Sequence, residues 1–192
     1  MHGHKIINQN ALHYITFTVV GWIDVFSKDE YRKIIIDSLI YCQNERGLVL
    51  NAYVIISNHI HLICYTKEPF ILSDFVRDFK KFTSKSIIES IQSNPHESRK
   101  ECMLKLFAYY AKYYKNNKTF QFWQQDCHPI ELVSPKWVNQ KLAYIHLNPV
   151  RNGLVNKAED FIYSSACAYT GQESILDIQL LEFDNTIGYI ES

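Results

Sequence analysis

A tight hairpin near the middle of the chain limits the folds that are open to it. Two strand-like runs, LVLNAYVII at 48–56 and HIHLICYT at 59–66, are separated only by Ser57 and Asn58. Runs rich in β-branched and aromatic residues, joined by so short a connection, are typical of paired antiparallel strands. The sequence therefore predicts an antiparallel sheet that contains this hairpin.

The second strand of the hairpin carries two histidines on one face. Ile60, Leu62 and Cys64 alternate onto one side, which leaves His59 and His61 together on the other side. Their side chains start about 6 to 7 Å apart along the strand, so their ring nitrogens can converge on one cation. Two protein ligands are too few for a site, and the alternative is a pair of ordinary hydrogen-bonded sheet histidines.

The elements around the hairpin predict an α+β fold. The expected order is a strand at 12–20, a helix at 27–47 capped by Ser27 with Glu30, the hairpin, a helix at 72–91 capped by Ser73, a further helix from 101, short strands at 119–124 and 129–133, and a helix from Ser134 and Pro135 to about 147. This order indicates helices on one face of a mostly antiparallel sheet, close to the ferredoxin-like plan.

Composition narrows the class of protein. The 192 residues are 47% hydrophobic, which fits one domain with its own core. Twenty basic and twenty acidic residues cancel, so a polyanionic partner would need a local basic patch. Five cysteines at unrelated spacings suit reduced thiols, and there is no run of roughly 18 apolar residues to span a membrane. We therefore expect a cytoplasmic protein with no membrane association.

The helix expected from 135 carries the other candidate site residues. Lys141, Tyr144 and Asn148 share one face, with Tyr144 and Asn148 one turn apart. Pro149 disfavours helical geometry at the residue before it, so Asn148 is expected at the helix end. The core-facing stripe of this helix is expected at Val138, Leu142 and Ile145.

Four segments carry a resemblance to a known family. YVIISNHIHLICYT, FWQQDCHPIELVS, YIHLNPVRNGLV and YSSACAYTG occur in the order and approximate spacing of the REP-associated tyrosine transposases, in the single-tyrosine HUH transposase superfamily. The resemblance covers about residues 10–172. It implies a single HUH-type domain over 1–192, with 173–192 as a C-terminal extension.

The resemblance also implies a function. Relatives are metal-dependent DNA transposases that cleave and rejoin hairpin-forming single-stranded DNA through a 5′-phosphotyrosine intermediate, as monomers or homodimers. By matching positions, His59 and His61 would bind Mg²⁺ or Mn²⁺ and Tyr144 would be the nucleophile. Asn148 falls where related transposases place a third metal ligand, often Gln, and it has a shorter reach.

Basic residues on two helices are candidates for DNA binding. Those on the helix at 72–91 interleave with Phe79 and Phe82, a mixture suited to contacting a DNA backbone and stacking on bases, although a solvated helix face has the same pattern. Arg151 lies just past the tyrosine helix. The full set of candidates is Arg77, Lys80, Lys81, Lys85, Lys141 and Arg151.

Several alternatives stay open from the sequence. Four other tyrosines crowd one segment, but none has a neighbouring amide like that of Tyr144: Tyr109, Tyr110, Tyr113 and Tyr114. Cys127 and His128 are adjacent, which is not the spacing of a zinc ligand pair. His146 is expected at the surface or in contact with DNA. The rival functions are a hairpin-binding protein that no longer cleaves and a metal-dependent hydrolase of small phosphoesters.

Overall fold

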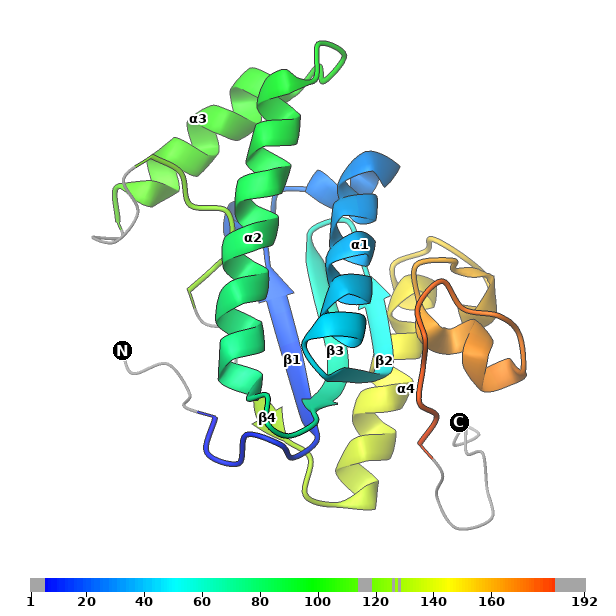
Figure 1. Cartoon of the computed structure of the whole chain (residues 1–192). Helices are drawn as coiled ribbons and strands as arrows, with labels where there is room; N and C mark the ends of the chain where they lie inside the picture. The colour runs from blue at the N-terminus through cyan, green and yellow to red at the C-terminus, as the bar shows by residue number, and fades with distance from the viewer. Residues whose placement is uncertain (1–5, 114–118, 126, 128, 182–192) are drawn as a thin grey trace.

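The computed structural model describes residues 6–113, 119–125, 127 and 129–181. Its centre is a four-stranded antiparallel sheet in the order β2-β3-β1-β4. The strands are β1 (His13–Thr18), β2 (Leu48–Ile55), β3 (His59–Thr66) and the two-residue β4 (Ile130–Glu131). This strand order, with a helix after β1 and after β3, is the ferredoxin-like α+β arrangement that the sequence predicts (Figure 1).

The predicted hairpin is confirmed and β3 lies at the centre of the sheet. It pairs with β2 on one side and with β1 on the other. In the β1 register, His61 lies opposite Thr16 and His59 lies opposite Thr18. Residues directly opposite each other point to the same face of a sheet, so this register places hydroxyl-bearing side chains of β1 beside the histidines.

Two long helices cover one face of the sheet. They are α1 (Asp29–Glu45) and α2 (Leu72–Ser93), which lie side by side in front of the strands in Figure 1. Alternate residues of the central strands fill the core below them, among them Phe17, Ile60 and Leu62. The helix α3 (Lys100–Ala111) follows α2 and packs its buried Phe107 on the end of this core.

The opposite face is covered by α4 (Pro135–Arg151), so the expectation that all helices lie on one face is wrong. The physical reason is that β2 is buried along its whole length, which requires an apolar layer on both sides. The stripe at Val138, Leu142 and Ile145 was predicted correctly. It packs on the second face of the sheet, where the buried residues are Tyr14, Ala52, Val54, Ile56 and Ile63.

The end of α4 also differs from the expectation. The helix continues through Pro149 to Arg151, so Asn148 lies inside it and not at its end. A proline removes one backbone donor, and here burial of Asn148 and Pro149 against the rest of the fold outweighs that loss. Ser134 caps the start of α4 as predicted, accepting a hydrogen bond from the backbone N–H of Trp137.

The two other predicted caps are wrong, one because of a local turn contact and the other because of a long-range contact. The helix α1 begins at Asp29, and the hydroxyl of Ser27 donates to the carbonyl oxygen of Asp24. Ser73 lies inside α2, where its backbone N–H and hydroxyl both donate to Oε1 of Gln9.

Short segments complete the fold. The run 119–124 forms no strand apart from a bridge between Trp123 and Val19. Four 3₁₀ turns are η1 (Val20–Trp22), η2 (Val25–Ser27), η3 (Ala158–Asp160) and η4 (Ser165–Thr170). Within the described ranges, none of the helices combines the length and apolarity needed to cross a bilayer.

Candidate functional site

The two histidines of β3 lie together on the face of the sheet that α4 covers. Their ring centroids are 4.7 Å apart. They sit near the start of β3, next to the end of β1. The predicted convergence of the two imidazoles is therefore present.

His61 is buried and held through one ring nitrogen. Its Nδ1 lies 2.8 Å from the hydroxyl of Tyr14 and 2.8 Å from the hydroxyl of Thr16. Burial lowers the pKa of His61 to about 3, and the positive charges of His59 and Lys141 act in the same direction. The ring is therefore neutral at pH 7. Its Nε2 is buried and has no hydrogen-bond partner in the described part of the chain.

Asn58 fixes the tautomer of His59. Its Nδ2 donates to the carbonyl oxygen of Trp22 at 3.2 Å and to Oδ1 of Asp24 at 3.0 Å. This leaves its Oδ1, an acceptor, facing Nδ1 of His59 at 2.7 Å. Nδ1 of His59 must therefore carry the proton, and its Nε2 keeps a lone pair. Burial lowers the pKa of His59 and favours the same neutral form.

The unpartnered Nε2 of His61 and the lone pair of His59 suit a cation. Imidazole binds a metal through a neutral nitrogen, and its other nitrogen then hydrogen-bonds to a fixed group, as both rings do here. The two imidazoles, of His59 and His61, therefore fit a divalent metal. No cluster of three His, Cys, Asp or Glu side chains suited to a metal occurs within the described residues, so a third protein ligand would have to be of another type.

Tyr144 reaches the histidines from α4. Its ring centroid lies 5.2 Å from that of His61 and 6.4 Å from that of Tyr14, edge-on in both cases. The side chain is 38% exposed, so a large substrate could approach it. A phenol from a distant part of the chain and two imidazoles from the sheet thus share one site.

Two cations flank the Tyr144 ring. Nζ of Lys141 lies 6.0 Å from the ring centroid, and also 4.5 Å above the ring of Tyr14. Cζ of Arg151 lies 5.9 Å from the Tyr144 centroid. Two positive charges close to the phenol favour a phosphate at this position.

Asn148 is buried one turn beyond Tyr144. Its Oδ1 accepts a hydrogen bond from Nδ2 of Asn152 at 2.8 Å, and its backbone carbonyl accepts another from the same group. Its role as a third metal ligand stays a prediction.

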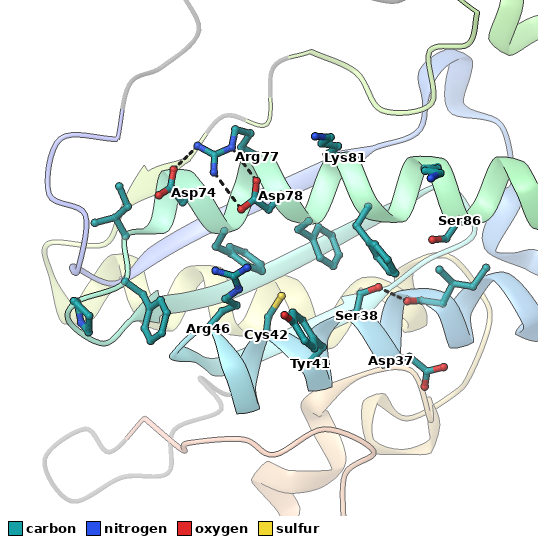
Figure 2. A pocket seen from close by; sticks show the side chains of 18 residues that line it. Asp37, Ser38, Tyr41, Cys42, Arg46, Asp74, Arg77, Asp78, Lys81 and Ser86 are labelled. Carbon is teal, nitrogen blue, oxygen red and sulfur yellow. Dashed lines mark hydrogen bonds and ion pairs between the residues drawn. The ribbon is translucent and has the colours of Figure 1, made fainter.

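The four candidate DNA-binding residues of α2 lie on the other side of the sheet from α4. Arg77 pairs with Asp74 and Asp78 (Figure 2). Nζ of Lys80 donates to the backbone carbonyls of Gln124 and Gln125. The structure therefore separates these residues, together with Lys81 and Lys85, from Lys141 and Arg151.

A groove of about 1040 Å³ runs between α1 and α2, on the face away from the histidines. Tyr41, Phe82 and Lys81 are among the side chains that line it, and Figure 2 shows Arg77 and its two carboxylates along one rim. It contains none of the residues predicted to act in catalysis.

Two other expectations can be compared with the structure. His146 is only 1% exposed, and its Nε2 lies 3.0 Å from the hydroxyl of Ser165, so the expected surface position is wrong. The reason is that the segment 158–170 covers this side of α4. On an exposed surface, the hydroxyl of Tyr113 donates a hydrogen bond to the hydroxyl of Tyr109. Tyr114 and His128 lie outside the described residues.

Sequence reasoning missed the side chains that hold the histidines. Tyr14 and Thr16 contact His61, and Asn58 and Trp22 contact His59. Tyr14 and Thr16 alternate along a predicted strand, but only the register with β3 shows that they face His61. Asn58 precedes His59 directly, and this adjacency was the one signal available in the sequence.

Comparisons with known proteins place this geometry in a known fold. No protein-family model and no curated protein matches the chain. A solved structure of a REP-associated tyrosine transposase bound to a REP hairpin matches all of this chain and 99% of that one, with 18% identity and a TM-score of 0.64. A candidate transposase from Deinococcus radiodurans R1 covers 76% of this chain and 95% of its own, with 20% identity, but its TM-score of 0.43 is too low to support an argument. The described part of the chain therefore has the fold of a REP-associated tyrosine transposase.

Proposed function

We propose that this protein belongs to the REP-associated tyrosine transposases and that it cleaves and rejoins hairpin-forming single-stranded DNA with a divalent metal, through a 5′-phosphotyrosine at Tyr144. The observation that carries the proposal is the accessible Tyr144 ring, edge-on to a buried neutral His61 whose Nε2 has no hydrogen-bond partner among the described residues. The similar fold of a transposase bound to a REP hairpin supports the choice of substrate.

The reaction needs a nucleophile held in line with a phosphodiester. The hydroxyl oxygen of Tyr144 forms a bond to phosphorus, and the bond from phosphorus to the 3′-oxygen breaks. The phenol loses its proton and the 3′-oxygen gains one, leaving a phosphotyrosine and a free 3′-hydroxyl. Attack by a 3′-hydroxyl on the phosphotyrosine reverses the step, so no nucleotide cofactor is needed.

Lys141 and Arg151 position the phosphate in this proposal. Both cations lie within about 6 Å of the Tyr144 ring, on the side of the sheet where the histidines lie. A phosphate that pairs with them would lie beside the phenol, and holding two reacting groups in this way lowers the entropic cost of their reaction.

His59 and His61 would hold the divalent metal, Mg²⁺ or Mn²⁺, with Asn148 as the proposed third ligand. Such an ion supplies charge neutralisation at the phosphate oxygens. An amide oxygen has two lone pairs, so the contact of Asn148 with Asn152 leaves one available.

A hairpin-binding protein that no longer cleaves is the second candidate. The contact between Asn148 and Asn152 favours it, because it occupies part of the proposed third ligand. Such a protein would keep the cations beside Tyr144 and bind DNA without forming a covalent product. His59, His61 and Tyr144 come from a single chain, so neither candidate requires a homodimer.

A covalent-adduct assay separates the candidates. Labelled single-stranded hairpins with varied flanking sequences are incubated with the protein and Mn²⁺ and analysed on denaturing gels. We expect an adduct with the wild type and with the control Tyr109→Phe, and none with Tyr144→Phe, although all three bind DNA. An adduct that persists in Tyr144→Phe would overturn the proposal, and hairpin binding without any adduct in the wild type would favour the second candidate.

A further inference from the structure

An exposed tryptophan lies against the candidate metal site. Trp22 is 60% exposed, and its ring stands edge-on to His59 with centroids 5.8 Å apart. The chain has three tryptophans. Trp123 is buried in the core, and Trp137 is on the first turn of α4. Trp22 is the one in ring contact with a histidine of the site.

The backbone at Trp22 adopts a conformation that such a residue avoids. Its φ is 55°, and it follows Gly21 with a φ of 62°. Positive φ is easy for glycine but strained for a bulky side chain. Burial of the indole does not offset this strain, because most of the ring is in solvent. A second glycine would serve the turn at a lower conformational cost, so the tryptophan has no evident benefit for folding.

The turn is nevertheless held firmly in place. The carbonyl oxygen of Trp22 accepts from Nδ2 of Asn58, whose Oδ1 holds His59. The backbone N–H of Trp22 donates to Val19, and that of Val20 donates to Phe122. The backbone of Trp22 is therefore fixed relative to the histidine through one asparagine. Strained residues that are held in this way are concentrated at ligand-binding sites.

We infer that Trp22 is a stacking platform for the nucleobase next to the phosphate that is cleaved. This inference rests on the proposed function of the His59, His61 and Tyr144 site. An exposed indole offers a flat apolar face, and stacking on an aromatic ring is how unpaired bases are bound with little sequence preference. Trp22 then holds a base on one side of the site, while Lys141 and Arg151 contact the phosphate on the other.

The Trp22→Gly variant tests the inference, because a structural and a binding role predict opposite results. Glycine relieves the strained φ, so we expect an unchanged or higher melting temperature. Loss of the platform should weaken binding of a single-stranded hairpin, measured in EDTA, by about 5-fold to 150-fold, the range for one stacked base. Trp22→Phe should retain part of the affinity, and the matched control Trp137→Phe should bind as the wild type does.

Fluorescence supplies a second readout that does not depend on the stability of the glycine variant. In a Trp137→Phe background, emission from exposed indole comes from Trp22, and bound DNA should quench it. Unquenched emission, or equal hairpin affinity of the Trp22→Gly variant and the wild type, would overturn the inference. If the wild type forms a covalent adduct and Trp22→Gly forms it equally well, only this inference fails. If no adduct forms but the emission is quenched, the platform stands and cleavage fails.

Discussion

At the scale of single residues, the hydrogen-bond partners of His59 and His61 determine how the two rings are oriented in the site. Asn58 can only accept from His59, because its amide nitrogen is used by Trp22 and Asp24. The hydroxyls of Tyr14 and Thr16 both reach Nδ1 of His61. Both rings thus direct Nε2 to the site, so affinity for a metal depends on residues that do not touch it.

Either hydroxyl, of Tyr14 or of Thr16, should be enough to hydrogen-bond Nδ1 of His61. Removal of one by Thr16→Val leaves Tyr14 as a partner, so we expect little change in Mn²⁺ affinity. The double variant Tyr14→Phe, Thr16→Val leaves Nδ1 without a partner and should lower the affinity by about 10-fold to 100-fold, measured by calorimetry. Tyr65→Phe, which removes a hydroxyl bonded to Gln179, is the control. Equal affinity of the double variant and the control would contradict this account.

The neighbouring asparagines give a test of the third ligand. If Asn148 binds the metal, Asn148→Ala should lower Mn²⁺ affinity by about 10-fold or more, and Asn148→Gln should restore part of it. Asn152→Ala removes the group that occupies Oδ1 of Asn148 and should leave the affinity equal or higher. A fall in thermal stability for both alanine variants, with unchanged Mn²⁺ affinity, would show that the pair is structural.

At the scale of helices and strands, residue spacing and identity predicted the features that later contacts in the fold did not change. The hairpin, the apolar stripe of α4 and its cap at Ser134 follow from residue spacing alone. The cap expected for α1 failed because the hydroxyl of Ser27 bonds to the carbonyl oxygen of Asp24 within the turn before the helix. The cap expected for α2 failed because Gln9, 64 residues away in the sequence, binds Ser73. Nothing in the sequence around Ser73 indicates that Gln9 lies beside it.

Some residues of the candidate site were likewise named from the sequence, and others are visible only in the structure. His59 and His61 were singled out by their spacing on one strand, and Tyr144 was singled out by the resemblance to the tyrosine transposases. Trp22 was missed because nothing in its local sequence shows that the turn after β1 returns to His59. Asn148 was placed at a helix end because a proline follows it, and only the burial of both residues shows why the helix continues.

The junction of α1 with α3 depends on one buried carboxylate. Glu97 pairs with Nζ of Lys28 at 2.9 Å and accepts from the hydroxyl of Tyr31 and the backbone N–H of Arg99. Burial by itself would raise the pKa of Glu97, but the three donors outweigh it and lower the pKa to about 2. The carboxylate therefore stabilises the fold in its charged form.

This carboxylate predicts a pH dependence of stability. Because the folded pKa lies below the ordinary value, the contribution of Glu97 is complete above about pH 4.5 and is lost as the pH falls towards 2. We expect Glu97→Gln to reduce the free energy of unfolding at pH 7 by an amount on the order of 2 kcal/mol, measured in urea. The difference from the wild type should shrink near pH 3, and the exposed Glu89→Gln should show neither effect. A difference that is constant with pH would contradict this role.

At the scale of the whole molecule, the sheet separates two surfaces of different character. One is formed by α1 and α2 with the groove between them, and the other by α4 with the histidines and Tyr144. Basic residues occur on both. Since Arg77 and Lys80 already have partners within the protein, the candidates with the clearest path to a DNA phosphate at Tyr144 are Lys141 and Arg151.

The salt dependence of DNA binding decides between the two surfaces. Each phosphate contact to a single strand contributes about 0.7 to the slope of log affinity against log salt, because counterions are released. The double variant Lys141→Gln, Arg151→Gln should weaken hairpin binding and reduce this slope by roughly 1.4. The matched pair Lys81→Gln, Lys85→Gln removes the same charge from α2 and should leave the slope unchanged. If the α2 variant lost affinity and salt slope instead, DNA would bind over the groove. The sheet would then separate the DNA from Tyr144, which would contradict cleavage by this tyrosine.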